Sequence, residues 1–412
     1  MQITNLRTER HDDRVRVAAH VQWEEAKRPS RDIFYETEAP FADRLRCDAN
    51  AFVAAAVVPA MRYGEKRMMV AGAICPKLHE GVRTATALLR RWYGPPRSDI
   101  RIEPSEGFTA ARPPAEPRAA CFISGGVDSL GMIRANRLNY PLDHPLSFRD
   151  AYFVYGIDMA VNDDTGARMK EFAWFRRTMQ PIVEDAQLDM IPVFTNFKQL
   201  EPDIGFWFAE FLGPGVASIG LAMGARSTDL SIGSSDYIGH LKKAGSHPLL
   251  DPNFSTAGLR VCYEQVGYRR LDKVRLIADW PAARHNLRVC YDYEDLEEGM
   301  MNCGRCPKCV YTQLELLVCG KLAEAPTFRN NDMTPADVDV MRIASPFTAD
   351  TLTELLDPLE RMGRADLVRV IRRKVRRYHA WPARLKRGTV RWLKQIDAEH
   401  LGGRLRRARN RR

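Results

Sequence analysis

One short segment of the chain combines residue types that suit phosphate chemistry: Ser124-Gly125-Gly126-Val127-Asp128-Ser129. An apolar run precedes it and a helical pattern follows, so the segment is predicted to join a strand to a helix. The glycines let the backbone approach a ligand, and free N–H groups at a helix start favour a phosphate. The hydroxyls of Ser124 and Ser129 add donors, and the carboxylate of Asp128 suits a divalent cation held against the phosphate. The simpler interpretation is a turn with a helix cap, and the segment lacks the Gly-Lys-Ser/Thr of a Walker A loop.

A cluster of cysteines has the spacing of metal ligands. Cys303, Cys306 and Cys309 follow one another at three-residue intervals. Cys290, on a predicted strand, supplies a fourth thiolate. Four cysteines suit tetrahedral Zn²⁺ in a closed structural site. A redox-active pair and an iron–sulfur cluster are the alternatives. The other cysteines are predicted to be buried as small apolar residues.

Two further segments offer an acid and a lysine. Leu230–Tyr237 is predicted as a strand that ends in a turn of small residues containing Gly233 and Asp236. An acid in this turn either contacts a ligand or caps the next element. Arg270–Ala278 is predicted as the start of a helix that carries Lys273. Its ammonium group either neutralises a departing anion or is solvated, as most lysines are.

These residues need elements that bring them together, and from about Arg118 the sequence alternates between strands and helices. The apolar, β-branched strands argue for an α/β fold with a parallel sheet covered by helices on both faces. Ligands of such sheets bind at the carboxyl ends of the strands. The predicted strands are 119–123, 151–157, 190–195 and 230–233, and the predicted helices are 129–138, 165–186 and 206–225.

The chain of 412 residues is long enough for two or three units. Residues 1–115 are predicted to form an N-terminal α+β domain, which the Pro-rich stretch 104–117 links to the rest. Residues 118–320 form the α/β core with the cysteine cluster, and residues 321–412 form a basic helical region. The remaining predicted elements are strands at 15–23 and 32–38 and helices at 51–62, 80–92 and 313–322.

The net charge of +10 is concentrated at the C-terminal end. Residues 361–412 contain 19 Lys and Arg against 3 Asp and Glu, so the rest of the chain is slightly acidic. A predicted helix there places Leu367, Ile371, Val375 and Tyr378 on one face, with basic residues between them. The basic side could bind RNA or DNA phosphates, rest on an anionic membrane surface, or remain a solvated helix face.

The composition indicates the cellular location that we expect for the protein. The N-terminus is charged and lacks the apolar core of a secretory signal. No stretch approaches the roughly 20 apolar residues of a membrane helix. The cysteine content is unlike that of a secreted disulfide scaffold. We therefore expect a soluble, cytoplasmic protein.

The segment Ser124–Ser129 resembles the pyrophosphatase loop of the N-type ATP pyrophosphatases, the PP-loop superfamily. The segment Leu230–Tyr237, Lys273 and the four cysteines follow in the order that 7-cyano-7-deazaguanine synthase-like proteins would predict. This resemblance extends over about residues 118–320. It implies an adenine-nucleotide alpha-hydrolase-like core, with a five-stranded parallel sheet that binds ATP.

The resemblance also implies roles for individual residues and three cofactors, ATP, Mg²⁺ and Zn²⁺. Asp128 would hold Mg²⁺, and Asp128 and Lys273 would act in catalysis. The four cysteines would hold Zn²⁺. The nucleotide would be bound by Ser124, Gly125, Gly126, Val127, Asp128, Ser129, Gly233 and Asp236.

The implied reaction is the adenylation of a substrate oxygen with release of pyrophosphate, after which a nitrogen nucleophile displaces AMP. The chain would then be an ATP-dependent C–N ligase or amidotransferase-like enzyme, whose partners are a small-molecule acid and a nitrogen donor. One alternative is an enzyme that modifies a base of tRNA or another nucleic acid. The other is a nucleotide-binding module without catalysis.

The chain departs from the deazaguanine synthases in the segment tied to their product. Their Tyr-Ser-Gly-Tyr-Pro-Asp is replaced by YIGHLKKAGSHPLLDP, so the resemblance does not name the substrate. The loop Ile238–Pro252 is a candidate substrate lid. Within it His247 and Asp251 either contact the substrate or belong to a plain surface loop.

Overall fold

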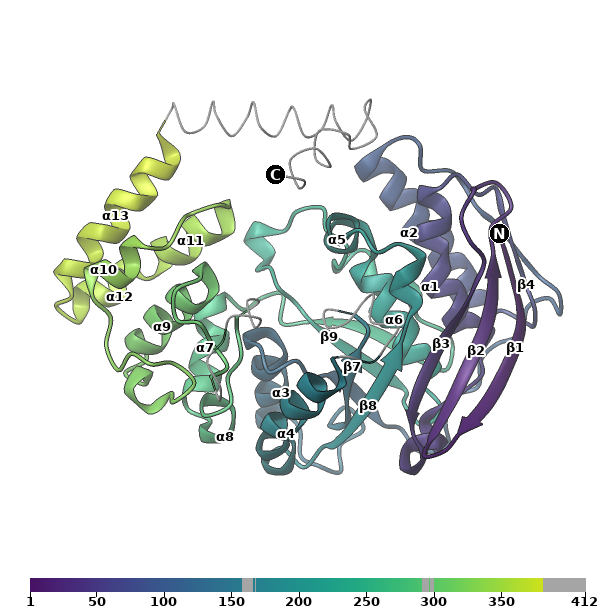
Figure 1. The fold of residues 1–412 in the computed structure, drawn as a ribbon, viewed down its shortest axis with the longest axis horizontal. Helices are drawn as coiled ribbons and strands as arrows, with labels where there is room; N and C mark the ends of the chain where they lie inside the picture. The colour runs from purple at the N-terminus through teal and green to yellow at the C-terminus, as the bar shows by residue number, and fades with distance from the viewer. Residues whose placement is uncertain (158–165, 167, 291–295, 297–299, 381–412) are drawn as a thin grey trace. The chain divides into compact units, whose positions relative to one another are not determined.

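The computed structural model describes residues 1–157, 166, 168–290, 296 and 300–380 (Figure 1). The chain divides into two compact units, Met1–Arg288 and Val289–Arg412. The first unit is an α/β structure around one sheet, as the sequence predicts, and the described part of the second is helical.

One 10-stranded, mostly parallel sheet organises the first unit. Its strand order is β10-β9-β6-β7-β8-β3-β2-β1-β4-β5. Neighbours are parallel from β10 to β8 and again from β1 to β5, whereas β8, β3, β2 and β1 pair in antiparallel fashion. The strands are β1 (Gln2–His11), β2 (Arg14–Gln22), β3 (Arg31–Glu38), β4 (Arg67–Val70), β5 (Arg101–Pro104), β6 (Ala119–Phe122), β7 (Phe148–Tyr155), β8 (Asp189–Thr195), β9 (Asp229–Gly233) and β10 (Arg260–Glu264).

The strands β6, β7, β8 and β9 form the parallel part that the sequence predicts, and β10 adds a fifth parallel strand that it did not predict. The chain first builds outward from β6 through β7 to β8, and then returns to place β9 on the other side of β6. The strand order therefore reverses between β6 and β9. In open α/β sheets such a reversal opens a crevice at the carboxyl ends of the two strands, where ligands bind.

Residues 1–115 extend this same sheet. The contact is between β3 and β8, where Tyr35 pairs with Thr195, and the Thr195 hydroxyl donates to the carbonyl of Phe34 at 2.7 Å. The Tyr35 hydroxyl also donates to Ser218 at 2.7 Å. The boundary between compact units lies after Arg288, whereas the sequence places a division near residue 115. Because β3 pairs with β8, the parallel part of the sheet does not end in an open edge at β8.

Helices cover both faces of the sheet, as predicted. On one face Gly220 of α6 touches β9, since a Cβ at Gly220 would lie 2.3 Å from Leu230 Cδ2. On the other face Phe172 of α4 stacks on Phe153 of β7, with ring centroids 4.8 Å apart. The helical elements of the first unit are η1 (Ala39–Arg44), α1 (Ala49–Arg62), α2 (Pro76–Tyr93), α3 (Val127–Asn139), α4 (Met169–Asp185), η2 (Phe197–Leu200), α5 (Ile204–Phe206), η3 (Trp207–Phe211), α6 (Leu212–Ala222), η4 (Ile238–His240), η5 (Asp251–Phe254), α7 (Arg270–Ala278) and α8 (Pro281–Arg284).

One prediction about apolar stretches was wrong. Ile204–Ala222 is a continuous helical stretch of 19 residues that is apolar and long enough to cross a membrane. Within the described residues, however, 72% of its apolar window is buried inside the protein. Its middle, η3, is a π-helical turn, and α6 packs against α1. This burial is that of a core helix.

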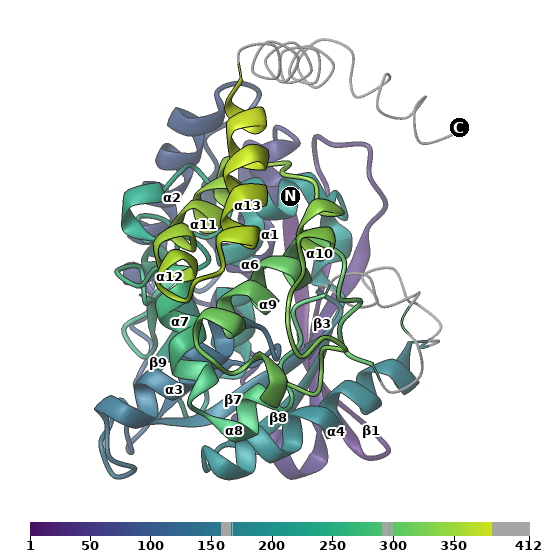
Figure 2. The same cartoon turned by 90° about the vertical axis from the view of Figure 1, so that its left-hand side faces the viewer.

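The described part of the second unit is a set of short helices around α13. The sequence predicts a helix at 313–322, but the helix starts earlier, because Pro307 fits its first turn and Cys306 caps it. Figure 2 shows α13 beside α10, α11 and α12. The helical elements are α9 (Pro307–Val318), η6 (Leu322–Glu324), α10 (Pro335–Asp339), α11 (Pro346–Glu354), α12 (Leu356–Arg361) and α13 (Ala365–His379).

Candidate functional site

The segment Ser124–Ser129, here called the phosphate loop, joins β6 to α3 as predicted. Gly125 has a φ of +75°, and a Cβ there would lie 2.8 Å from the sulfur of Met179. Only glycine fits this position without strain. The second glycine does not need positive φ, since Gly126 has a φ of −86° and precedes the first residue of α3. The backbone N–H of Arg288 donates to the Gly125 carbonyl at 2.9 Å and fixes the turn.

The two serines of the phosphate loop bond to each other. The hydroxyl oxygens of Ser124 and Ser129 lie 3.1 Å apart, and the Ser129 hydroxyl accepts from the N–H of Ser124 at 3.2 Å. The Ser124 hydroxyl accepts from the N–H of Gly126 at 3.4 Å. These contacts fix the turn before α3, whose first N–H groups have no partners within the helix.

Lys273 lies beside the phosphate loop and is not a solvated helix residue. It is 1% exposed, and its ammonium group donates to Asp128 Oδ1 at 3.1 Å. The same group donates to the Ser234 hydroxyl at 3.1 Å and to the Ser234 carbonyl. Gly131 makes this approach possible, because a Cβ there would lie 3.1 Å from Lys273 Cβ. α3 and α7 therefore pack closely enough to bring the ammonium group to Asp128.

The turn after β9 also meets the phosphate loop. A Cβ at Gly233 would lie 3.0 Å from the carbonyl oxygen of Asp128, so the absence of a side chain sets this approach. Ser234 follows at once, is fully buried, and its N–H donates to the Glu264 carbonyl at 2.9 Å. Sequence reasoning missed Ser234. The available signal was its position directly after Gly233 in a turn already singled out.

Asp236 lies on the same turn, but none of its described contacts is with Lys273. Its carboxylate is 3.8 Å from the ammonium group of Lys242. Burial raises the pKa of Tyr263 in β10, and the negative charges of Asp251, Asp236 and Asp128 raise it further.

The side chains of His247 and Asp251 are buried and are therefore not accessible to a substrate. Asp251 is fully buried, and its carboxylate accepts from the Ser246 hydroxyl at 2.5 Å and from the His247 N–H at 3.0 Å. Burial raises the pKa of Asp251 to about 7. The His247 ring packs edge-on against Trp92 with centroids 4.9 Å apart, and burial lowers its pKa. Both residues fix the base of the 238–252 loop, so a role in binding is not supported for either.

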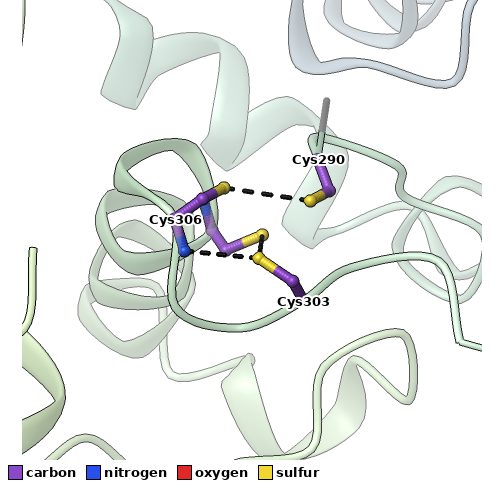
Figure 3. A group of neighbouring side chains, drawn as sticks. Cys290, Cys303 and Cys306 are labelled. Atoms are coloured by element: carbon purple, nitrogen blue, oxygen red, sulfur yellow. Dashed lines mark hydrogen bonds between the residues drawn. The ribbon is translucent and has the colours of Figure 1, made fainter. Parts of the chain in front are cut away.

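The four cysteines of the second unit converge (Figure 3). Their sulfur atoms all lie within 4.8 Å of one another. The sulfurs of Cys290 and Cys306 are 3.9 Å apart, and those of Cys303 and Cys309 are 3.8 Å apart. A tetrahedral zinc ion with Zn–S bonds of about 2.3 Å holds its sulfurs about 3.8 Å apart. The cluster thus has the ligand set and spacing for a metal ion such as zinc.

The backbone around the cysteines supports the same interpretation. The N–H of Cys306 donates to the Cys303 sulfur at 3.3 Å, and the N–H of Cys309 donates to the Cys306 sulfur at 3.5 Å. Gly304 has a φ of +73°, as a tight knuckle requires. Hydrogen bonding and charge from the neighbouring cysteines, together with burial, raise the pKa values of Cys306 and Cys309. A dication removes this mutual repulsion of thiolates. Cys290 follows a stretch without regular structure, so the strand predicted there was wrong.

Two hollows among the described residues of the first unit lie away from the phosphate loop. One, of about 450 Å³, lies between α4 and the strands β2, β3 and β8 and is lined by Arg14, Phe172 and Arg176. The other, of about 140 Å³, lies between α3 and the strands β9 and β10. Neither is lined by a residue of the phosphate loop.

Comparisons of the chain with models of protein families, with curated proteins and with solved structures return no match.

Proposed function

We propose that the first unit binds ATP at the phosphate loop and that the protein is an adenylating C–N ligase of the PP-loop class. The observation that carries the proposal is the buried Lys273 ammonium group, which contacts Asp128 and Ser234 beside the loop. The loop also lies where the strand order reverses, between β6 and β9. A phosphate-sized anion would there meet a helix start, hydroxyl donors and a lysine together.

The proposed task of these residues is to hold the β and γ phosphates while the bond to the α phosphate breaks. The N–H groups at the start of α3 and the hydroxyls of Ser124 and Ser129 would donate to phosphate oxygens. Lys273 would offset the negative charge that grows on departing pyrophosphate. Its burial strengthens this effect, because little water screens the ammonium group.

The carboxylate oxygens at the phosphate loop suit a divalent cation. The Asp128 carboxylate is 35% exposed and so remains open to a ligand while it contacts Lys273. Asp128 would hold Mg²⁺, and Asp236 is the next carboxylate on the adjoining turn. The ion would neutralise charge on the phosphates.

The proposed reaction has two steps. A carboxylate oxygen of a small-molecule acid attacks the α phosphorus of ATP, and the bond to pyrophosphate breaks. A nitrogen nucleophile then attacks the adenylated carbon, loses a proton, and AMP leaves with the electron pair of the broken C–O bond. The products are an amide or related C–N compound, AMP and pyrophosphate. We also propose a cytoplasmic location, where the thiols of the cysteine cluster would stay reduced.

The test is pyrophosphate release from ATP by the full chain, assayed over a panel of acids and amines. The double variant Ser124→Ala/Asp128→Asn should abolish release, because it removes a donor and the proposed cation ligand. The matched control Asp99→Asn/Ser105→Ala makes the same changes on the surface near β5. Unchanged release in the first variant would overturn the proposal. ATP binding without release over the whole panel would instead leave a nucleotide-binding module.

A nucleic-acid base is the second candidate for the acceptor. The observation that favours it is the exposed row of arginines on α13. Release of pyrophosphate that depends on an added nucleic acid, and on no small acid, would select this candidate.

A further inference from the structure

The helix α13 has two opposite faces of different chemistry. Leu367, Val368 and Ile371 are buried, and α13 packs with α10, α11 and α12. The other side carries exposed basic residues: Arg369, Arg372, Arg373, Arg376 and Arg377. With about 100° between successive helix residues, these five arginines fall within one continuous face. We call them the arginine row.

Few acids neutralise the arginine row. Arg372 contacts Glu360 at 2.7 Å, and Arg373 contacts Asp339 at 2.9 Å. These pairs are exposed, and exposed pairs exchange readily with other partners because they contribute about 1 kcal/mol or less. Arg369, Arg376 and Arg377 have no ion pair within the described residues. Among the described residues of the second unit, the row therefore presents positive charge that few acids balance.

We propose that the arginine row binds the phosphate backbone of duplex DNA without reading its sequence. The row extends over about 12 Å of helix, along which a duplex presents about seven phosphate charges. Arginine suits phosphate through its planar pair of donors. A helix face can reach the phosphates that border the wide major groove of B-form DNA, whereas the major groove of A-form RNA is deep and narrow.

The surroundings of the row argue against two other occupants. A membrane-surface helix buries its apolar side among lipids, but the apolar side of α13 is already covered by protein. Single-stranded nucleic acid binds where exposed aromatic rings stack on bases. The described rings of α13 are Tyr378, which lies about 180° from the arginine row and is only partly exposed, and the exposed His379 at the end of the helix. A single imidazole is not the series of rings on which successive bases stack. Phosphate contact along a duplex remains the best match.

The test is binding of the full chain to a labelled duplex DNA of about 20 base pairs over a range of salt. The variant Arg369→Gln/Arg376→Gln/Arg377→Gln removes three positive charges from the row. Each lost phosphate contact lowers the slope of log affinity against log salt by about 0.9. The change in affinity between 50 and 200 mM salt should therefore be about 40-fold smaller in the variant than in the wild-type chain.

The matched control Lys66→Gln/Arg83→Gln/Arg101→Gln removes the same charge from exposed positions of the first unit. The control should keep the wild-type slope, and both variants should keep the wild-type melting temperature. An unchanged slope in the α13 variant, or an equal loss in the control, overturns the proposal. So does binding that prefers duplex RNA or anionic vesicles to DNA. The outcome does not depend on ATP, so it is independent of the ligase proposal.

Discussion

The substitution Lys273→Met isolates the charge beside the phosphate loop. Methionine keeps an unbranched, buried side chain but removes the ammonium group that contacts Asp128 and Ser234. If this group stabilises departing pyrophosphate, its loss should slow pyrophosphate release by about 100- to 1,000-fold, which corresponds to about 3–4 kcal/mol. Affinity for ATP should also fall, because fewer positive charges face the phosphates.

The effect of Lys273→Met on the free energy of unfolding should be smaller than its effect on the activation free energy of pyrophosphate release. The change leaves the buried carbonyl of Ser234 without a donor, which costs about 1–3 kcal/mol. It also removes a 1% exposed charge, whose desolvation opposes folding by several kcal/mol. Asp128 is 35% exposed, so water replaces its lost contact. Because these effects oppose each other, we expect the free energy of unfolding to change by at most about 2 kcal/mol.

Arg118→Met is the matched control, since it breaks an ion pair at the opposite edge of the sheet. Arg118 lies 3.0 Å from the fully buried carboxylate of Asp150, near the amino ends of β6 and β7. Its loss should cost at most about 3–5 kcal/mol of stability, because Arg44 remains 3.9 Å from Asp150, and should leave ATP affinity intact in the folded fraction. The assays are pyrophosphate release, calorimetric titration with ATP and thermal unfolding. Wild-type release and affinity in Lys273→Met would refute the reasoning, as would an equal loss of affinity in Arg118→Met.

Three other substitutions test separate parts of the structure. Cys309→Ser, or removal of metal by a chelator, should lower bound zinc from about one ion per chain and destabilise the second unit, as measured by metal analysis and thermal unfolding. Gly233→Ala should slow pyrophosphate release and cost about 1–3 kcal/mol, because the new Cβ would lie 3.0 Å from the Asp128 carbonyl oxygen. Asp251→Asn should flatten the pH dependence of unfolding. The pKa of Asp251 rises from 3.8 to about 7 on folding, so its stabilising effect is complete below pH 3.8 and is lost as pH rises towards 7, by about 1.4 kcal/mol per unit.

Each of these substitutions has a control. Cys319→Ser changes a cysteine outside the cluster and should keep the zinc, so equal zinc loss would contradict the assignment of ligands. Gly267→Ala adds a methyl group with no atom within 4 Å and should be nearly neutral. If it slows release as much as Gly233→Ala does, the close approach is irrelevant. Parallel pH profiles for wild-type protein and Asp251→Asn would show that Asp251 does not bind a proton on folding.

The sequence predicted local elements better than their assembly. Strand–helix alternation gave β6, β7, β8 and β9 to within a few residues, because apolar runs and glycine turns encode local geometry. It did not reveal β10 or the pairing of β3 with β8. That pairing joins residues about 160 positions apart, as Tyr35 and Thr195 illustrate, and no local pattern specifies it. It decides that residues 1–115 extend the sheet.

The residues of the candidate site also divide into those that the sequence predicted and those that only the tertiary structure brought together. The sequence by itself predicted the turn Ser124–Ser129 between β6 and α3 and the cysteine knuckle, because contiguous residues with fixed spacing carry their own geometry. Only the tertiary structure decided that Lys273 is buried against Asp128, that Ser234 joins them, and that His247 and Asp251 are turned inward. Burial and ion pairing depend on which distant surfaces meet. Those surfaces are set by the packing of α3 on α7 and of the 238–252 loop on the core, and not by the neighbours of a residue along the chain.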